Sequence, residues 1–297
     1  MKKTNSELKI EKQTAAPYLF ILVPFILMAV FYLYPIFYMV YLSFFKWNMM
    51  KPKKFIGLHN YIQIFHDPDV WQIGRNTCYY MIFTVAFSLI LSLLLALYLK
   101  ENTRTNRFIQ SCIFSPYIIP LVSVAFIWTW IMDSDFGLLN YLLSCIGLKP
   151  VKWLNDPDMA LTSLVIVSVW KNIGYNTIII SSALAGIPKY LYEAAELDEA
   201  NPVTVFFKIT IKMISPTMFF LLLVNIISAF KAFEIVQIMT LGGPQNSTNT
   251  IVYAIYQYGF KFYKIGFASA LGVILLIVIS ILTYLYFKLL KSNIHYQ

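Results

Sequence analysis

Charged residues are scarce in this sequence. Only 12% of its 297 residues are Asp, Glu, Lys or Arg, whereas 59% are hydrophobic, and the mean hydropathy is +0.67. Soluble domains have about 25% charged and about 45–50% apolar residues. This composition excludes a water-soluble globular protein and predicts a chain embedded in a membrane.

Motifs of catalysis, nucleotide binding and metal binding are also absent. The sequence has no GxxxxGK[ST], HExxH or GxSxG, and its three histidines lie far apart. Its cysteines, Cys78, Cys112 and Cys145, form no CxxC pair. We therefore expect no catalytic residue, metal site or cofactor on this chain, and an intramembrane enzyme has no support.

The net charge of +9 comes from basic residues that are scattered singly between apolar stretches. Nucleic-acid-binding proteins instead gather Lys and Arg into a stripe or cluster. We expect the lipid bilayer as a partner, and no nucleic acid.

Long apolar stretches recur along the chain, and each is long enough to cross about 30 Å of hydrocarbon as a helix. The predicted spans are about 17–44, 76–99, 109–132, 159–187, 213–241 and 265–287. Prolines bend the first and third spans without excluding them, since neighbouring helices can satisfy the freed carbonyls. The pattern predicts an all-α polytopic membrane protein with six transmembrane helices, forming a single transmembrane domain over residues 1–297.

Six spans place both termini on one side of the membrane. Lys and Arg are divided almost equally between the two sides, so the positive-inside rule does not fix the orientation.

The most distinctive segment, residues 186–216, lies between the fourth and fifth spans. Within it, residues 190–200 are predicted to form a short amphipathic helix with a polar rim of Glu193, Glu196 and Glu199. A short acidic helix with alanines suits docking against a basic soluble partner. The alternative, a helix lying on lipid headgroups, is disfavoured because anionic lipid repels Glu.

A second helix is predicted directly after the first. Asn201 is a typical N-cap, Pro202 suits the first helical position, and the helix continues through 203–211. The segment is therefore expected to be a helix-turn-helix.

This segment resembles the EAA loop of bacterial ABC importer permeases of the carbohydrate-uptake class, typified by the maltose and multiple-sugar systems. The resemblance rests on Ile187-Pro188, Glu193-Ala194-Ala195, Leu197-Asp198, Ala200, Phe206, Ile209-Thr210 and Pro216. Segments at 57–65, 115–132, 137–140 and 240–260 are also similar to sugar permeases, in the same order and spacing. The chain departs from the family at Glu199, where glycine is usual, and at Lys212, where proline is usual.

The resemblance implies a type I ABC importer permease in the bacterial plasma membrane, with both termini and the EAA loop in the cytoplasm. It implies as partners a second homologous permease, two cytoplasmic ATPase subunits that bind ATP and Mg, and an extracytoplasmic sugar-binding protein. The residues that would couple to the ATPase are Glu193, Ala194, Ala195, Leu197, Asp198, Glu199 and Ala200.

Polar and aromatic side chains inside the fourth and fifth spans are candidates for the substrate path. Ionisable side chains at membrane depth cost about 2.5–3.5 kcal/mol, so they usually face a cavity or a partner. The candidates are Lys171, Asn172, Tyr175, Phe230, Lys231, Phe233, Glu234 and Gln237. Two alternatives remain open: a packing ion pair between Lys231 and Glu234 on one helix face, or a lysine that reaches toward the membrane surface.

Aromatic rings and amides together suit a sugar, which has apolar C–H faces and hydroxyl groups. Trp128 and Trp130 in the third span fit either this path or an interfacial belt. The sequence thus predicts a sugar-importing ABC permease. The alternatives are a permease for a peptide or glycerol phosphate, and half of an ion-coupled secondary carrier.

Overall fold

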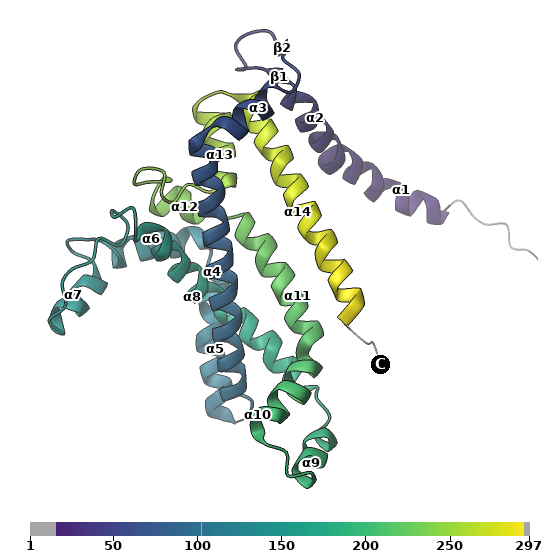
Figure 1. Cartoon of the computed structure of the whole chain (residues 1–297), viewed down its shortest axis with the longest axis vertical. Coiled ribbons are helices and arrows are strands. Elements are labelled where there is room, and N and C mark those ends of the chain that lie inside the picture. Colours follow the sequence, from purple (N-terminus) through teal and green to yellow (C-terminus); the bar gives the residue numbers. More distant parts are fainter. Residues whose placement is uncertain (1–15, 102, 294–297) are drawn as a thin grey trace, which may run out of the picture.

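The computed structural model describes residues 16–101 and 103–293 (Figure 1). Residues 1–15 and 294–297, whose cytoplasmic location we predicted, lie outside this part. The elements are α1 (Ala16–Met28), η1 (Ala29–Leu33), α2 (Tyr34–Ser43), β1 (Phe45–Lys46), β2 (Lys54–Phe55), α3 (His59–His66), α4 (Pro68–Tyr98), α5 (Arg104–Ile118), α6 (Leu121–Ile131), α7 (Leu138–Cys145), α8 (Ala160–Ala185), α9 (Lys189–Leu197), α10 (Pro202–Val205), η2 (Phe206–Thr210), α11 (Ile211–Phe230), α12 (Glu234–Met239), α13 (Ile251–Tyr256), η3 (Gln257–Lys261) and α14 (Ile265–Asn293), where η marks a π-helical turn.

The predicted all-α membrane fold is confirmed. Within residues 16–101 and 103–293, five helical segments are long and apolar enough to cross a membrane: Phe20–Ser43, Pro68–Tyr98, Ala160–Ala185, Pro202–Phe230 and Ile265–Lys288. A sixth span results if α5 and α6 are counted together, although they meet at 99°.

The bend between α5 and α6 falls at Pro120. Proline has no amide hydrogen to donate to the preceding turn, and it disfavours helical backbone in the residue before it. Ile119 accordingly adopts an extended conformation, with φ −68° and ψ 134°. The third predicted span, 109–132, is therefore two helices rather than one straight helix.

The fifth span differs from the prediction of 213–241 at both ends. It begins at Pro202, because the Asn201 side chain caps it by accepting a hydrogen bond from the Val203 amide at 2.9 Å. The predicted second helix of the helix-turn-helix is thus the start of this span. The span ends at Phe230, and α12 follows as a separate helix. In the break, the Thr250 hydroxyl donates to the Ala232 carbonyl at 2.9 Å.

The second span begins at Pro68, eight residues before the predicted start at 76. Asp67 is its N-cap and accepts a hydrogen bond from the Asp69 amide at 3.0 Å, while Pro68 occupies the first helical position. The Asp67-Pro68 pair is a sequence signal for this start, whereas apolar length alone places the boundary later.

The core lies where α4, α8 and α11 pack together, joined by α6 and α12. Small residues allow close approach of these helices. A Cβ at Gly174 of α8 would collide with the backbone of Ile113 and Phe114 in α5. Ser92 of α4 donates to the Ile173 carbonyl of α8 at 2.9 Å.

The molecule has two distinct ends (Figure 1). One end carries α9, and the other carries the two-stranded antiparallel ladder of β1 and β2, in which Lys46 pairs with Lys54. The α2 helix packs against α14, whereas α1 runs away from the bundle.

Candidate functional site

A cavity of about 260 Å³ lies among α4, α6, α8 and α11 and the break before α12. It brings together several path candidates from the fourth and fifth predicted spans: Lys171, Asn172, Lys231, Phe233 and Glu234. Lys171 and Asn172 come from α8, whereas Lys231, Phe233 and Glu234 come from the break between α11 and α12, which lies against α8 at this cavity.

Lys171 has a structural partner at this cavity. Its ammonium group donates hydrogen bonds to the carbonyl oxygens of Pro116, Tyr117 and Ile119, at 3.2, 3.2 and 2.6 Å. These carbonyls belong to the end of α5, where the bend leaves them without intrahelical donors. A cation at the C-terminus of a helix also interacts favourably with the helix dipole. Lys171 therefore holds the bend in place while it lines the cavity.

Lys231 and Glu234 do not share a helix face, and this prediction is wrong. The helix ends between them: Lys231 is the C-cap of α11, and Glu234 is the first residue of α12. Both side chains are exposed at the cavity. Within the described residues, no ion pair joins them, so the packing alternative loses its basis.

Buried polar residues form the inner wall. Asn176 of α8 and Asn225 of α11 exchange two amide hydrogen bonds, at 3.2 and 3.1 Å. The Tyr80 hydroxyl of α4 lies 2.6 Å from the Ser168 hydroxyl of α8. Tyr80, Ser168 and Asn225 line the cavity, and we did not predict them.

A sequence signal for this wall did exist. Tyr80, Thr84, Ser88 and Ser92 recur every four residues in an otherwise apolar helix, which places them on one face. All four are buried. A search for charges and exposed aromatics overlooks such a stripe of small polar groups.

Three path candidates lie elsewhere. Tyr175 stacks on Tyr117, with ring centroids 4.5 Å apart, Phe230 is buried in the core, and Gln237 lies farther along α12. Trp128 packs edge-on against Trp170. The Trp130 side chain is 61% exposed.

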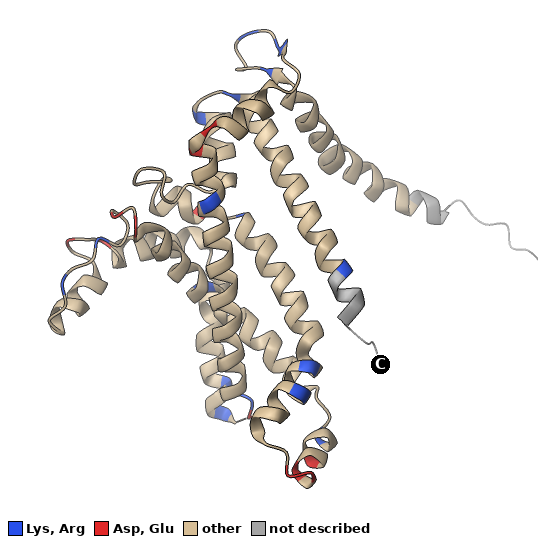
Figure 2. Ribbon diagram, viewed as in Figure 1, with Lys and Arg blue, Asp and Glu red and all other residues tan. Residues whose placement is uncertain are grey.

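The coupling candidates lie on α9 and in the turn that follows it, at the far end of the molecule (Figure 2). The inner face of α9 is anchored, because Ala195 is buried and the Tyr192 hydroxyl lies 3.1 Å from that of Thr210. The outer face exposes Glu193, Ala194, Glu196, Asp198 and Glu199, with Ala200 partly covered. Leu197 is 86% exposed among these acids.

The turn after α9 explains the departure at Glu199. The Ala200 amide donates to the Ala195 carbonyl at 2.9 Å, and the Glu199 amide donates to Glu196 at 3.0 Å. This pair of bonds is a Schellman motif, which requires a left-handed residue that is usually glycine. Glu199 adopts that conformation, with φ 50°. The turn therefore has the geometry that glycine usually provides, although Glu199 occupies the position.

No group of three or more His, Cys, Asp or Glu side chains within 16–101 and 103–293 could hold a metal ion. The cavity offers a solute hydrogen-bonding groups, an aromatic ring and charged side chains that form no ion pair within the described residues. This arrangement can bind a polar organic solute.

Comparison with known proteins agrees with this geometry. Residues 88–296 match the family described as the inner membrane component of binding-protein-dependent transport systems. Among curated relatives, the sulfoquinovosyl glycerol transport system permease SmoG of Agrobacterium fabrum is 30% identical, covering 90% of this chain and 88% of SmoG. The sn-glycerol-3-phosphate transport system permease UgpA of Pectobacterium atrosepticum is 34% identical, covering 82% of this chain and 83% of UgpA.

A solved structure shares the fold. A chain of a bacterial alginate ABC transporter, in complex with an alginate pentasaccharide-bound periplasmic protein, has a TM-score of 0.78 at 22% identity, covering 92% of this chain and 93% of that one. The family and these relatives are transport components rather than enzymes. The helical bundle, its polar cavity and the family match over 88–296 together show that this chain belongs to the inner membrane components of binding-protein-dependent transport systems, the permeases of ABC importers.

Proposed function

We propose that this permease imports a sugar, an oligosaccharide or a related polyol through the cavity at the α11–α12 break. The observation that carries the proposal is the make-up of this cavity. Phe233 offers a ring face for sugar C–H groups, whereas Asn172 and Ser228 offer hydrogen bonds for hydroxyls. SmoG, a relative, is named for a sulfoquinovosyl glycerol transport system.

An anionic polyol is a second candidate. The Lys231 side chain is exposed at the cavity and forms no ion pair with a described carboxylate, so it is free to meet a negative group on a substrate. The relative UgpA is named for sn-glycerol-3-phosphate transport, which also supports an anionic polyol.

Uptake by the reconstituted complex separates the two candidates. Proteoliposomes would be offered neutral sugars and sn-glycerol 3-phosphate, each with its binding protein. If the substrate is anionic, Lys231→Gln should reduce uptake about tenfold or more, as expected for loss of a charged hydrogen bond. If the substrate is neutral, Phe233→Leu should reduce uptake and Lys231→Gln should not. Unchanged uptake in Phe233→Leu, Glu234→Gln and Lys231→Gln would contradict this location of the path.

We also propose that α9 docks on an ATPase subunit. Its exposed acids can pair with basic residues, while Leu197 and Ala194 give an apolar contact at the centre. The full importer would contain a second permease, two ATPase subunits that bind ATP and Mg, and an extracytoplasmic binding protein.

The connection between α9 and the cavity supports coupling between them. The Asn201 cap fixes the start of the span Pro202–Phe230, and this one span ends at the cavity. Movement of α9 by the ATPase would therefore be carried along a single helix to Lys231. An opening that alternates between the two sides of the membrane follows from such rigid-body motion.

Docking of a cytoplasmic ATPase places α9 and both termini in the cytoplasm. Reporter fusions at Gln297 and in the 46–75 connection test this orientation. An external signal at Gln297 would overturn it.

A further inference from the structure

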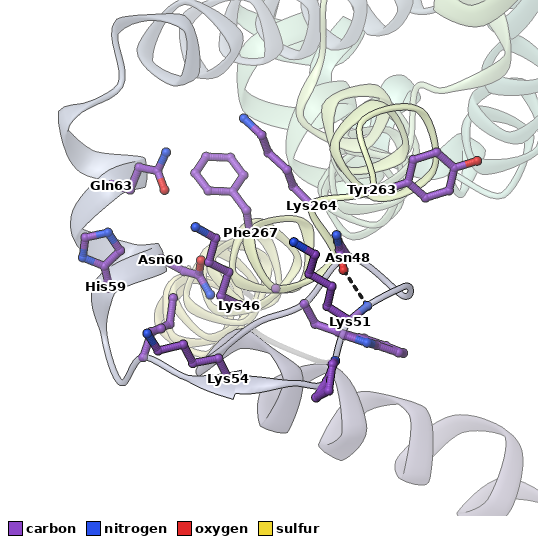
Figure 3. Close-up of a pocket in the computed structure, with 14 residues that line it drawn as sticks. Lys46, Asn48, Lys51, Lys54, His59, Asn60, Gln63, Tyr263, Lys264 and Phe267 are labelled. Carbon is purple, nitrogen blue, oxygen red and sulfur yellow. Dashed lines mark hydrogen bonds between the residues drawn. The ribbon is translucent and has the colours of Figure 1, made fainter.

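A large basic bowl lies at the opposite end of the molecule from α9 (Figures 1 and 3). Its volume is about 1060 Å³, and its walls come from β1, the β1–β2 connection, β2, α3 and the segment that leads into α14. Lys46, Lys51, Lys54 and Lys264 all line it, and no Asp or Glu is among its lining residues. Figure 3 shows these four ammonium groups on the walls of one concavity.

Two of these lysines are held in an unfavourable arrangement. Lys46 and Lys54 are direct partners in the antiparallel ladder. Side chains of such a pair stand about 4.5–5.5 Å apart at Cβ, and like charges there destabilise the ladder. An anion between them would turn this repulsion into attraction.

The ladder is fixed, so the lysines cannot simply separate with their strands. The buried Asn60 amide of α3 donates to the Ser43 and Phe45 carbonyls, at 2.7 and 3.0 Å. The Ile265 amide donates to the Trp47 carbonyl at 3.0 Å. These bonds join the ladder to α3 and α14.

The positive charge of the bowl is not neutralised within the described part of the chain. None of its four lysines forms an ion pair there, and the Lys264 ammonium lies over the Tyr258 ring, 5.7 Å from its centroid. By contrast, Lys53 in the same connection donates to the Tyr38 hydroxyl at 3.0 Å and is not part of the bowl. The N-terminal end of α14 adds a partial positive charge.

The bowl also lies at the border of the membrane. The first span ends at Ser43 and the last begins at Ile265, next to the lysines on both sides. Tyr263, which lines the bowl, is 47% exposed, and Met50, in the β1–β2 connection between the lining residues Asn48 and Lys51, is 80% exposed. Lysines beside exposed apolar side chains are typical of surfaces that contact anionic headgroups and the upper part of their acyl chains.

We propose that this bowl binds the phosphate of an anionic phospholipid, with Lys46 and Lys54 on either side of the phosphate. Met50 and Tyr263 then contact the acyl chains. A soluble phosphate would satisfy the lysines but would leave these apolar side chains in water, and this is why a lipid is the occupant that the surface fits. The proposal does not depend on the substrate of the importer.

Native mass spectrometry tests this proposal by measuring which lipid stays bound to the full-length chain. The chain is released from nanodiscs that contain equal amounts of phosphatidylglycerol and phosphatidylcholine. The wild type should retain phosphatidylglycerol. Each lysine near a lipid surface contributes about a fivefold factor, so Lys46→Gln with Lys54→Gln should weaken retention about 25-fold. Lys46→Arg with Lys54→Arg should retain the lipid. Lys149→Gln with Lys152→Gln, an equal charge change outside the bowl, should have no effect.

Thermal unfolding in neutral detergent gives a second readout. Phosphatidylglycerol should raise the midpoint for the wild type, while inorganic phosphate at equal concentration should not. If the ladder variant does not fold, Lys264→Gln, which is outside the ladder, should lose about fivefold in retention. Equal retention of the two lipids, full retention in the Gln variants, or the same stabilisation by inorganic phosphate alone would each overturn the proposal.

Discussion

Asn176 and Asn225 exchange two side-chain hydrogen bonds across the interface of α8 and α11, behind the cavity. Both amides are buried, and Asn225 also donates to the Leu221 carbonyl at 2.8 Å. A reciprocal amide pair of this kind fixes both the distance and the register of two helices. The cavity wall thus depends on a polar contact that no charge-based search of the spans detects.

Removing one member of this pair should cost stability. Asn176→Leu leaves the Asn225 amide partly unsatisfied in an apolar interior, at a cost of about 1–3 kcal/mol. The double change of Asn176 and Asn225 to Leu should cost less than the sum of the single changes, because no orphaned amide remains. Thermal unfolding of the purified importer in detergent measures this cycle, and costs that add within about 0.3 kcal/mol would contradict the pairing.

Gly174→Ala should separate α5 from α8. The added methyl group would meet the backbone of Ile113 and Phe114, which cannot move without shifting α5. Overpacking of this kind typically costs about 1–3 kcal/mol. Gly74→Ala is the matched control, since a Cβ at Gly74 meets no atom within 4 Å. A Gly174→Ala protein with the unfolding midpoint of the wild type would show that the two helices are not in close contact.

Lys171→Met should loosen the bend between α5 and α6. This change removes three hydrogen bonds to the carbonyls of Pro116, Tyr117 and Ile119. Hydrogen bonds that involve a charged group are worth about 1.5–3 kcal/mol each, and partial hydration of the carbonyls should reduce the total loss to about one such bond. Lys171→Arg should keep most of the stability. If Met and Arg behave alike in thermal unfolding, Lys171 does not hold the bend.

The turn after α9 predicts that glycine is better tolerated than a β-branched residue at position 199. Its φ of 50° lies in the left-handed region, which glycine adopts without steric cost and β-branched residues avoid. Glu199→Gly should therefore leave stability equal or higher, whereas Glu199→Val should cost about 1 kcal/mol or more. Protease susceptibility of the 186–212 connection and thermal unfolding report on this order. Equal behaviour of the Gly and Val variants would contradict the left-handed turn.

Much of the fold could be predicted from local signals. Apolar length identified the spans, and the Asn201 cap followed by Pro202 identified the turn after α9. These features depend on a few neighbouring residues. The break at Lys231 could not be predicted in this way, because the backbone there is satisfied by Thr250, a residue distant in sequence.

The candidate site could be predicted from the sequence only in part, for the same reason. The sequence predicts that Lys171 lies within a span. It does not predict that Lys171 bonds the carbonyls at the end of α5, because this depends on α5 ending beside it, before Pro120. The Lys231–Glu234 spacing predicted a shared face only as long as the helix was assumed to be continuous. The sequence shows that Glu199 replaces the usual glycine, but only the structure shows that Glu199 adopts the left-handed conformation of that glycine.

Binding-protein-stimulated ATP hydrolysis distinguishes a coupling role of α9 from a purely structural one. The complete importer would be reconstituted into liposomes without ion gradients, with wild-type permease or Glu193→Lys, and hydrolysis and uptake would be followed together. Lys189→Gln, at the first residue of α9, is the control variant. We predict ATP-dependent uptake for the wild type and the control, and loss of both stimulated hydrolysis and uptake for Glu193→Lys, which remains inserted. Uptake without ATP, or unchanged uptake and ATPase association in Glu193→Lys, would contradict the account.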